Sequence, residues 1–309
     1  MAEKKYATID IGSNSILLYI AEKNSNGKFK SVINLSEITR LGNNLHNTGI
    51  LNNVAIQKSL EVIKNYKKIC DENNVSEIAA VGTMALRTAL NSNEFTKQAE
   101  NETGIKIEII TGEEEARLSY IALKEGIGIA RESLAFDIGG GSTEFIYADS
   151  FSIKKRFSIN IGAIKFTESY LKSNPPTNEE ILDAETSINQ EISSLNLNKN
   201  IQILAGMGGT VTNLAAVKHE MLSYNPDIIQ GSIITMEELQ NQIRNFSSKT
   251  LEERKNIPGL EPKRADVILA GALIIKSILI NSGKDSFIVS DFGIRHGLMF
   301  DKFGNRKLI

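Results

Sequence analysis

The sequence predicts an α/β protein made of two related domains, and three observations support this prediction. The stretch "ATIDIGSNSILLYI" near the start returns as "LAFDIGGGSTEFIY", so that Asp10 corresponds to Asp137 and Ser15 to Ser142. Segments typical of strands and helices follow both copies in the same order. A chain of 309 residues is also longer than one small core requires.

The first half begins with three strands and continues with alternating helices and strands. The strand-like stretches "YATIDI", "ILLYIAE" and "KFKSVINLSE" are separated by turns rich in glycine, serine and asparagine. Apolar residues at helical spacing predict a helix from Asn52 to Asn73. A strand over 78–82, a helix beginning near Ser92, the strand "IKIEIIT" and a helix through "EEEARLSYIALKEG" complete this half.

The second half starts the same pattern again. The stretch "LAFDIGGGSTEFIYADSFSIKKRFSINIG" has room for three strands, and helices with a strand over Ile201–Ala205 follow. We expect one domain over residues 1–126 and the other over 127–309. The apolar run "VILAGALIIKSILI" from Val267 contains a lysine and is too short to span a bilayer, so it predicts a buried core helix.

The composition argues against several classes of protein. Lys plus Arg number 35 and Asp plus Glu 37, so the net charge of −2 gives a nucleic acid no general attraction. Cys70 is the only cysteine, which excludes an internal disulfide and fits a reducing compartment. The N-terminus shows no apolar signal region, so we expect a cytoplasmic protein with neither membrane nor nucleic acid as partner. The three histidines lack the spacing of zinc ligands.

The repeated turns have the features of phosphate-binding loops. An aspartate at a strand end followed by small residues exposes several backbone N–H groups, and glycine lets a ligand approach closely. A third glycine-rich turn, "GMGGTVTNL", stands before a probable helix, whose N-terminus also favours an anion. Neither a Walker A motif nor a Rossmann fingerprint is present. The expected phosphate-binding residues are Gly12, Ser13, Asn14 and Ser15, then Gly139, Gly140, Gly141, Ser142 and Thr143, and finally Gly208, Gly209 and Thr210.

Five motifs together resemble the exopolyphosphatase/guanosine pentaphosphate phosphohydrolase (Ppx/GppA) family. They are "IDIGSNS", "GTMALR", "GEEEAR", "FDIGGGSTE" and "GMGGT", which occur in the family's order and cover almost the whole chain. The resemblance implies two ribonuclease-H-like domains of the actin-like ATPase superfamily, with an active cleft between them. Some members carry an extra C-terminal helical domain. This sequence resembles the short, two-domain form.

The helix opening "TGEEEARLSY" offers three consecutive glutamates. Such residues suit the helix dipole without any catalytic role, and Thr111 with Glu114 has the spacing of a capping box. Glu115 is better placed to face elsewhere, and the resemblance implies that it is the catalytic base. A general base works best with a pKa near the ambient pH, so this role predicts a neighbouring negative charge or partial burial at Glu115.

The resemblance gives roles to five further charged residues. Arg87 in "GTMALR" would contact a phosphate, because arginine can bind it bidentately, and Arg264 would contact a more distal one. The acids Asp10, Asp137 and Glu144 would bind Mg²⁺ or orient water. Strand-end carboxylates suit a hydrated Mg²⁺, and which of the three touches the ion is left open.

These residues and the resemblance imply an Mg²⁺-dependent hydrolase that releases terminal orthophosphate from inorganic polyphosphate. Conversion of guanosine pentaphosphate to the tetraphosphate uses the same groups and is the alternative. The short form and the lack of an N-K-x-D run favour polyphosphate. A nucleotide-binding switch or assembly protein of the actin-like class is a further interpretation, which "GEEEAR" disfavours. The resemblance also allows a homodimer.

Overall fold

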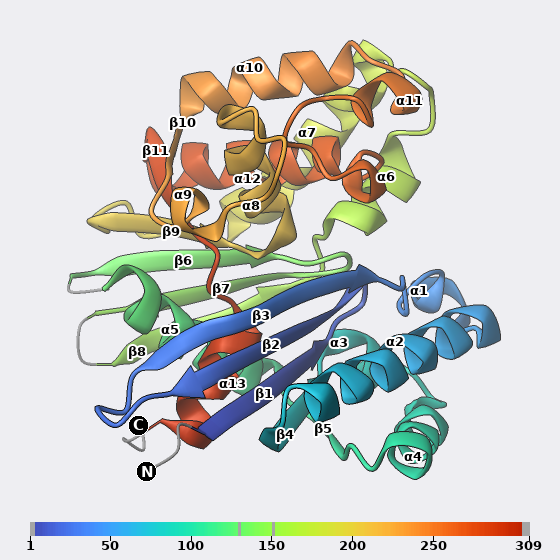
Figure 1. Cartoon of the computed structure of the whole chain (residues 1–309). Helices are drawn as coiled ribbons and strands as arrows, with labels where there is room; N and C mark the ends of the chain where they lie inside the picture. Colours follow the sequence, from blue (N-terminus) through green and yellow to red (C-terminus); the bar gives the residue numbers. More distant parts are fainter. Residues whose placement is uncertain (1–3, 129–130, 150–151, 305–309) are drawn as a thin grey trace. The chain divides into compact units, whose positions relative to one another are not determined.

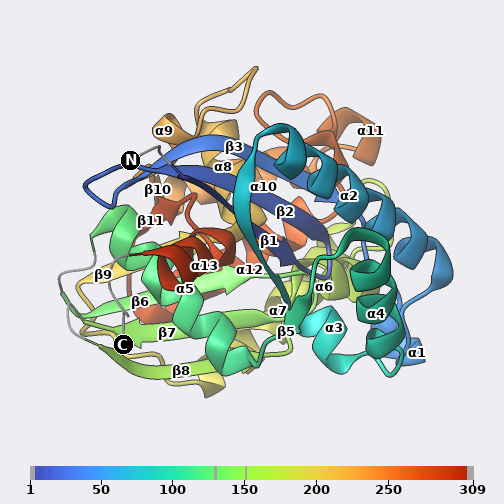
Figure 2. The same ribbon diagram turned by 60° about the horizontal axis from the view of Figure 1, so that its bottom comes forward.

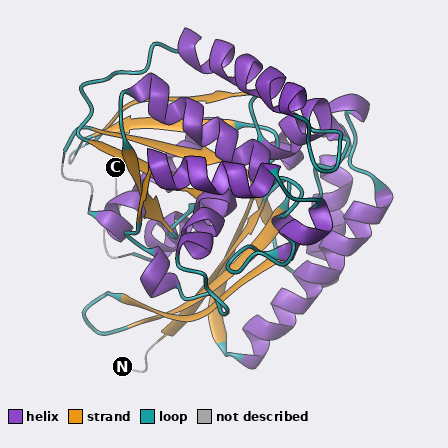
Figure 3. Cartoon of the chain, turned by 90° about the horizontal axis from the view of Figure 1, so that it is seen from above, coloured by secondary structure: helices purple, strands orange, loops and turns teal. Residues whose placement is uncertain are grey.

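The computed structural model describes residues 4–128, 131–149 and 152–304, and helices and strands are mixed throughout (Figures 1 and 3). The chain forms two compact units. Unit 1 consists of Met1–Ala122 with Gly293–Ile309, and unit 2 of Leu123–Phe292. The α/β class is confirmed. The division differs from two consecutive domains over 1–126 and 127–309, because the last helix packs against the sheet of unit 1.

Unit 1 contains a five-stranded sheet in the order β3-β2-β1-β4-β5. The three predicted opening strands form an antiparallel meander, and the last two strands run parallel to β1. This is the strand order of a ribonuclease-H-like domain, as the resemblance implied. The strands are β1 (Lys4–Ile11), β2 (Ser15–Lys23), β3 (Phe29–Ile38), β4 (Val75–Gly82) and β5 (Ile107–Ile109).

Helices cover both faces of the sheet in unit 1. Alternate residues of β1, such as Ile9 and Ile11, pack in one core with α2 (Asn53–Glu72), and α4 (Ser92–Thr103) lies beside α2 (Figure 2). The opposite face is covered by α13 (Ile294–Phe303), whose backbone accepts a hydrogen bond from Thr8. Two short helices, α1 (Leu45–Thr48) and α3 (Met84–Thr88), complete the unit.

The chain passes from unit 1 to unit 2 through α5 (Gly112–Ile127). Unit 2 repeats the strand order of unit 1 as β8-β7-β6-β9-β11 and adds the short antiparallel β10 at the edge. The predicted duplication is therefore a duplication of topology. The strands are β6 (Ser133–Ile138), β7 (Thr143–Ala148), β8 (Ile153–Ile159), β9 (Ile203–Met207), β10 (Ile233–Thr235) and β11 (Ser286–Ser290).

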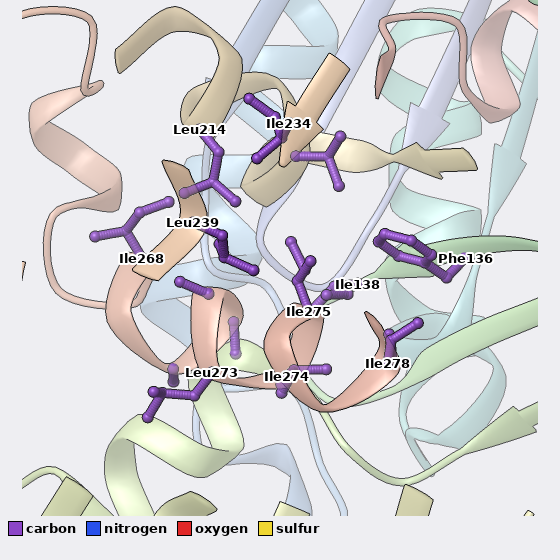
Figure 4. Packing of buried hydrophobic residues seen from close by; sticks show 14 of the residues in the cluster. Phe136, Ile138, Leu214, Ile234, Leu239, Ile268, Leu273, Ile274, Ile275 and Ile278 are labelled. Atoms are coloured by element: carbon purple, nitrogen blue, oxygen red, sulfur yellow. The ribbon is translucent and has the colours of Figure 1, made fainter. Parts of the chain in front are cut away.

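The core of unit 2 is built around α12 (Ile268–Ser282), the predicted buried helix. Figure 4 shows Phe136 and Ile138 of β6 in the same cluster as Ile275 and Ile278 of α12. Among the described residues, no helix has the length and apolar character needed to cross a membrane. The other helices are α6 (Ala163–Tyr170), α7 (Asn178–Ser194), α8 (Gly208–Lys218), α9 (Pro226–Ile229), α10 (Met236–Ser247) and α11 (Leu251–Arg254), with a 3₁₀ turn over Pro262–Arg264.

Candidate active site

The two repeated turns have the same backbone geometry. In the first, the N–H of Gly12 donates to the carbonyl oxygen of Ser15 over 2.9 Å, and in the second that of Gly139 donates to Ser142 over 2.9 Å. A Cβ placed on either glycine would lie 3.2 Å from that same oxygen. Each turn joins the first two strands of its own sheet. The sequence repeat thus corresponds to a repeated arrangement of backbone groups.

In the first turn, the segment after β3 binds the carbonyl groups. The oxygen of Ser13 accepts the N–H of Gly42 over 2.8 Å. The oxygen of Asn14 accepts the N–H groups of Thr39 and Arg40 over 3.0 and 2.9 Å. In a trans peptide the following N–H points opposite to the carbonyl. The N–H groups of the next residues in the turn therefore point away from this segment.

In the second turn, the start of α6 binds the carbonyl groups, which lie one position earlier in the repeat than those bound in the first turn. The carbonyl oxygen of Gly139 accepts the N–H of Ala163 over 3.0 Å. The carbonyl oxygen of Gly140 accepts the N–H groups of Ile164 and Lys165 over 2.9 and 3.1 Å. The N–H groups that follow these carbonyls point away from α6 for the same reason. Consecutive N–H groups directed to one side of a turn form a concavity that binds anions.

Asp10 is a buried acid at the end of β1. Its neighbours Ile9 and Ile11 lie in the core, so Asp10 projects from the other face of the sheet. It is 7% exposed, and its Oδ1 atom has no hydrogen-bond partner among the described groups. Burial raises the pKa of Asp10 to about 6, although the charge of Arg295 acts in the opposite direction. A buried carboxylate oxygen of this kind suits a metal ion or its bound water.

In unit 2, Asp137 and Glu144 are paired across β6 and β7. Side chains directly opposite in an antiparallel pair lie on the same face, with Cβ atoms about 5 Å apart. Glu144 is buried, and its Oε1 atom accepts the hydroxyls of Ser142 and Ser158 over 2.7 and 2.9 Å. Two neighbouring carboxylates, one of them fixed by hydroxyl donors, form an oxygen-rich site.

The third turn lies beside the second within unit 2. The helix predicted at this turn is α8, which begins at Gly208, and this glycine has a φ of +85°. A Cβ at Gly208 would overlap Oδ1 of Asp137, and one at Gly209 would overlap the guanidinium of Arg264. The backbone at the start of α8 is therefore in close contact with both charged groups. Arg264 donates from Nε to Glu261 over 3.2 Å.

Asn213 connects these parts, although it was assigned no role within the stretch "GMGGTVTNL" that contains it. Its Nδ2 donates to the carbonyl oxygen of Gly209 over 2.9 Å, and its Oδ1 accepts the N–H of Glu261 over 2.8 Å. Glu261 begins the short turn that carries Arg264. A single buried amide thus ties the start of α8 to that turn, and only the folded chain reveals this link.

Four of the expected phosphate ligands are buried residues, namely Ser15, Ser142, Thr143 and Thr210, and the two threonines are buried most deeply. The hydroxyl of Thr143 donates to the carbonyl oxygen of Ile161 over 2.6 Å, and the residue has no exposed surface. Thr210 is 3% exposed and packs so closely on α12 that a Cβ at Gly271 would overlap it. Their side chains therefore stabilise unit 2. Only their backbone groups belong to the turn and to the helix N-terminus.

In unit 1, Arg87 of α3 pairs with Glu115 of α5. Its Nη1 donates to Oε2 of Glu115 over 3.1 Å and to the carbonyl oxygen of Ile110 over 2.9 Å. Glu115 is 8% exposed, which confirms the expected burial, while the charged group beside it is a cation. The pairing fixes the direction of the Glu115 carboxylate. Among the described residues, both hydrogen bonds of Arg87 come from Nη1, so Nε and Nη2 can serve a phosphate.

Glu114 has a different partner from the one expected. Thr111 accepts the N–H of Glu114 over 3.1 Å, as in a capping box. The carboxylate of Glu114, however, binds Nε and Nη2 of Arg117 over 2.9 and 2.7 Å. Arg117 also donates to Asp301 of α13 over 2.9 Å, and these bonds raise its pKa above the ordinary value. Glu114 and Arg117 therefore anchor α5 to α13, and Glu115 is the glutamate that faces elsewhere.

Comparison with known proteins gives a match over most of the chain. The model of the Ppx/GppA phosphatase family matches residues 19–306. A crystal structure of the Aquifex aeolicus member of that family shares 34% identity, covers 97% of each chain and superposes with a TM-score of 0.84. Two of the three glycine-rich turns lie inside the matched range, and the first turn precedes it.

Three curated relatives differ in length. "Exopolyphosphatase 2" of Mycobacterium tuberculosis is 28% identical over 98% of this chain and 100% of its own length. The "Bifunctional 3-dehydroquinate synthase/phosphatase" of Fusobacterium nucleatum is 35% identical over 92% of this chain, which spans 44% of that protein. The "Guanosine-5'-triphosphate,3'-diphosphate pyrophosphatase" of Photobacterium profundum is 28% identical over 96% of this chain, which spans 59% of it.

Proposed function

The chain belongs to the Ppx/GppA phosphatase family, and from this premise we propose that it is an exopolyphosphatase. The reaction is the release of terminal orthophosphate from inorganic polyphosphate. The observation that carries the proposal is the pair of turns with the same Gly–Ser hydrogen bond, 2.9 Å in each. A polyphosphate chain repeats one kind of anionic group, which repeated sets of backbone donors fit. The match to "Exopolyphosphatase 2" over that protein's whole length supports this substrate.

Glu115 is the proposed general base. Water attacks the terminal phosphorus, its proton passes to the carboxylate of Glu115, and the bond from phosphorus to the bridging oxygen breaks. The products are orthophosphate and a polyphosphate shortened by one unit. Arg87 holds the carboxylate of Glu115 in place through the 3.1 Å ion pair. The remaining N–H groups of Arg87 can stabilise charge on the transferred group, because such catalysis consists mainly of positioning and electrostatics.

The turns are the proposed phosphate-binding groups. Each directs consecutive N–H groups to one side, because its carbonyls are bound from the other side. The N-terminus of α8 adds further donors and its dipole, and the guanidinium of Arg264 lies against that backbone. In this proposal the side chains of Thr143 and Thr210 have no contact with the substrate.

The acids fit Mg²⁺ as a cofactor. The described residues contain no group of three or more His, Cys, Asp or Glu that could hold an ion by themselves. Mg²⁺, however, is usually held by one or two carboxylates together with substrate phosphates and water. Asp137 and Glu144 would hold it in unit 2, and Asp10 offers in unit 1 a buried oxygen that has no hydrogen-bond partner among the described residues. Bound there, the ion would neutralise negative charge on phosphate oxygens.

A second candidate is hydrolysis of guanosine pentaphosphate to the tetraphosphate. The match to the Photobacterium protein, whose name states such a substrate, favours it. The same base, turns and acids would serve this reaction, since both substrates end in a phosphoanhydride. We place it second because the chain spans only 59% of that relative.

Phosphate release by the purified protein with Mg²⁺ tests both candidates. Long-chain polyphosphate and guanosine pentaphosphate are assayed in parallel, and the substrate with the higher kcat/KM identifies the activity. Glu115→Gln removes the base with little change in shape, and we expect kcat to fall by about 10²–10⁴-fold. Glu113→Gln, on the exposed side of the same helical turn, is the matched control and should stay within about twofold.

Two outcomes would overturn the proposal. One is a folded wild-type protein that releases phosphate from neither substrate. The other is a Glu115→Gln variant that is as active as the wild type. Tight ATP binding with slow turnover in the first case would favour a nucleotide-binding switch instead.

A further inference from the structure

We propose that Gly42 and Gly162 are positioning residues for the two phosphate-binding turns. Each belongs to a short segment that binds the carbonyl side of a turn. We call these segments, residues 39–42 and 162–165, the turn clamps. This inference rests on the proposed function of the turns. It adds that the direction of their N–H groups depends on a second layer of backbone, which contacts no phosphate itself.

The first turn clamp is in contact with Ser13. The N–H of Gly42 donates to the carbonyl oxygen of Ser13 over 2.8 Å. A Cβ at Gly42 would lie 2.9 Å from Cβ and 3.3 Å from Cα of Ser13, distances that real Cβ atoms rarely or never show. Any side chain at position 42 therefore pushes Ser13 out of its place in the turn.

The second turn clamp lies closer to its turn than the first clamp does. A Cβ at Gly162 would overlap the carbonyl carbon and oxygen of Gly140 and lie 2.5 Å from the carbonyl carbon of Gly141. These atoms are backbone and cannot rotate out of the way. The next three residues of the clamp donate their N–H groups to Gly139 and Gly140. A side chain at position 162 must therefore separate the clamp from the turn.

Both glycines are required by close approach and not by backbone conformation. Neither has a positive φ; Gly162, for example, has a φ of −144°. Each follows a fully or almost fully buried apolar residue, Leu41 or Ile161, after the third strand of its sheet. Each half of the chain thus has a clamp as well as a turn, although the carbonyls of Gly139 and Gly140 lie one position earlier in the repeat than those of Ser13 and Asn14. The two clamps share only an apolar residue followed by glycine, and this pattern is too short to identify a clamp from the sequence.

The clamp determines where the donors point. Each carbonyl that a clamp binds belongs to a planar trans peptide, whose N–H points the opposite way. Rotation of that peptide when the clamp moves turns the N–H away from a bound phosphate. A hydrogen bond to a charged group is strong enough that losing one weakens binding by about 10- to 100-fold. Because the phosphate is bound in both ground and transition states, the loss should appear in KM and not in kcat.

Gly42→Ala tests the first clamp and can be rescued. We expect its KM for tripolyphosphate to rise about tenfold, with kcat within about twofold of the wild type. Ser13→Gly removes the Cβ at 2.9 Å. In the Ser13→Gly background, adding Gly42→Ala should therefore change KM by less than about twofold. Such non-additivity is expected of residues in direct contact and absent from independent sites.

Gly162→Ala tests the second clamp, where no single substitution can relieve the overlap. We expect a rise in KM toward about 100-fold. Gly293→Ala is the matched control, because a Cβ there meets nothing within 4 Å and φ is an ordinary −132°. Calorimetric binding of tripolyphosphate to the same variants in a Glu115→Gln background gives the Kd without turnover.

The outcomes separate this inference from the proposed function. A wild type that neither cleaves nor binds tripolyphosphate overturns the proposed function. An active wild type with Gly42→Ala and Gly162→Ala variants of unchanged KM and Kd overturns only the clamps. A loss of kcat that follows the folded fraction, at unchanged KM, also overturns the clamps, since it shows a purely structural role.

Discussion

The two repeated turns agree in their backbone and differ in their acids. Both have the same glycine-to-serine hydrogen bond. In the first turn, Asp10 lies opposite Leu17 of the neighbouring strand, whereas in the second Asp137 lies opposite Glu144. Duplication has therefore kept the main-chain donors, which depend on conformation, while the side chains have diverged. We infer that the first turn mainly binds phosphate and that the second also supports the chemistry.

The side chains at the tips of the two turns have also diverged. The first has Ser13 and Asn14 where the second has Gly140 and Gly141. A Cβ at Gly140 would lie 2.7 Å from Cδ1 of Ile164, so a serine there would require the side chain of Ile164 in α6 to move. The second turn thus consists of bare backbone beside two carboxylates. The first combines backbone with two polar side chains.

Removal of one charge from each turn should give the largest difference. Asp137→Asn should lower kcat by about 10²–10³-fold, the usual cost of losing a group that stabilises transition-state charge. Asp10→Asn should raise KM by no more than about tenfold. Steady-state phosphate release at saturating Mg²⁺ measures both. Equal losses in kcat would contradict the division of labour between the turns.

Gly208→Ala should have the next largest effect. The added Cβ overlaps Oδ1 of Asp137, and the φ of +85° is strained for alanine. We expect activity to fall about 100-fold and the melting temperature to fall as well. Gly104→Ala, with a φ of +71° but open space around it, is the matched control for strain alone, which costs about 1–2 kcal/mol. If Gly104→Ala impairs activity equally, the contact with Asp137 is irrelevant.

The pH dependence of stability should identify the buried acid of the first turn. Burial raises the pKa of Asp10 from 3.8 to about 6. The folded state therefore keeps the proton of Asp10 while the unfolded state loses it, so the contribution of Asp10 to stability is largest below pH 4 and is lost as the pH rises through 6. The change is about 2–3 kcal/mol. Urea unfolding across pH 4–7 measures the free energy of unfolding, which should fall more steeply with pH in the wild type than in Asp10→Asn. Parallel plots of this free energy against pH for the two proteins would refute the prediction.

Ser158→Ala should give the smallest effect and sharpen the comparison. Its hydroxyl donates to Oε1 of Glu144 over 2.9 Å, and Ser142 supplies a second donor to the same atom. We expect kcat to fall about three- to tenfold, because one donor is left. Ser158→Thr keeps the hydroxyl and should restore most of the activity. A Thr variant as impaired as the Ala variant would show that packing matters here and not the hydrogen bond.

The sequence predicted what depends on short stretches of chain. The opening meander, the helix over Asn53–Glu72 and the buried α12 follow from apolar spacing, and the twin turns from their identical residues. Long-range contacts were not predictable. Asn213 is linked to Glu261 and Gly42 to Ser13 across distant positions, and no periodicity records such pairs. The prediction that a capping box with Thr111 would occupy the carboxylate of Glu114 was wrong for a related reason. Arg117 competes for that carboxylate and binds it instead.

The return of the chain to unit 1 at Gly293 has a consequence for the order in which the protein is made. The sheet of unit 1 is complete once Ile109 has been synthesised, yet Ile294, Leu298 and Met299, which cover one of its faces, come almost 200 residues later. Unit 2 lies wholly between these two events. On the ribosome, therefore, unit 2 can fold while the face of the unit 1 sheet that α13 later covers is still exposed. Chaperones that bind exposed β-sheet surface should act during this interval.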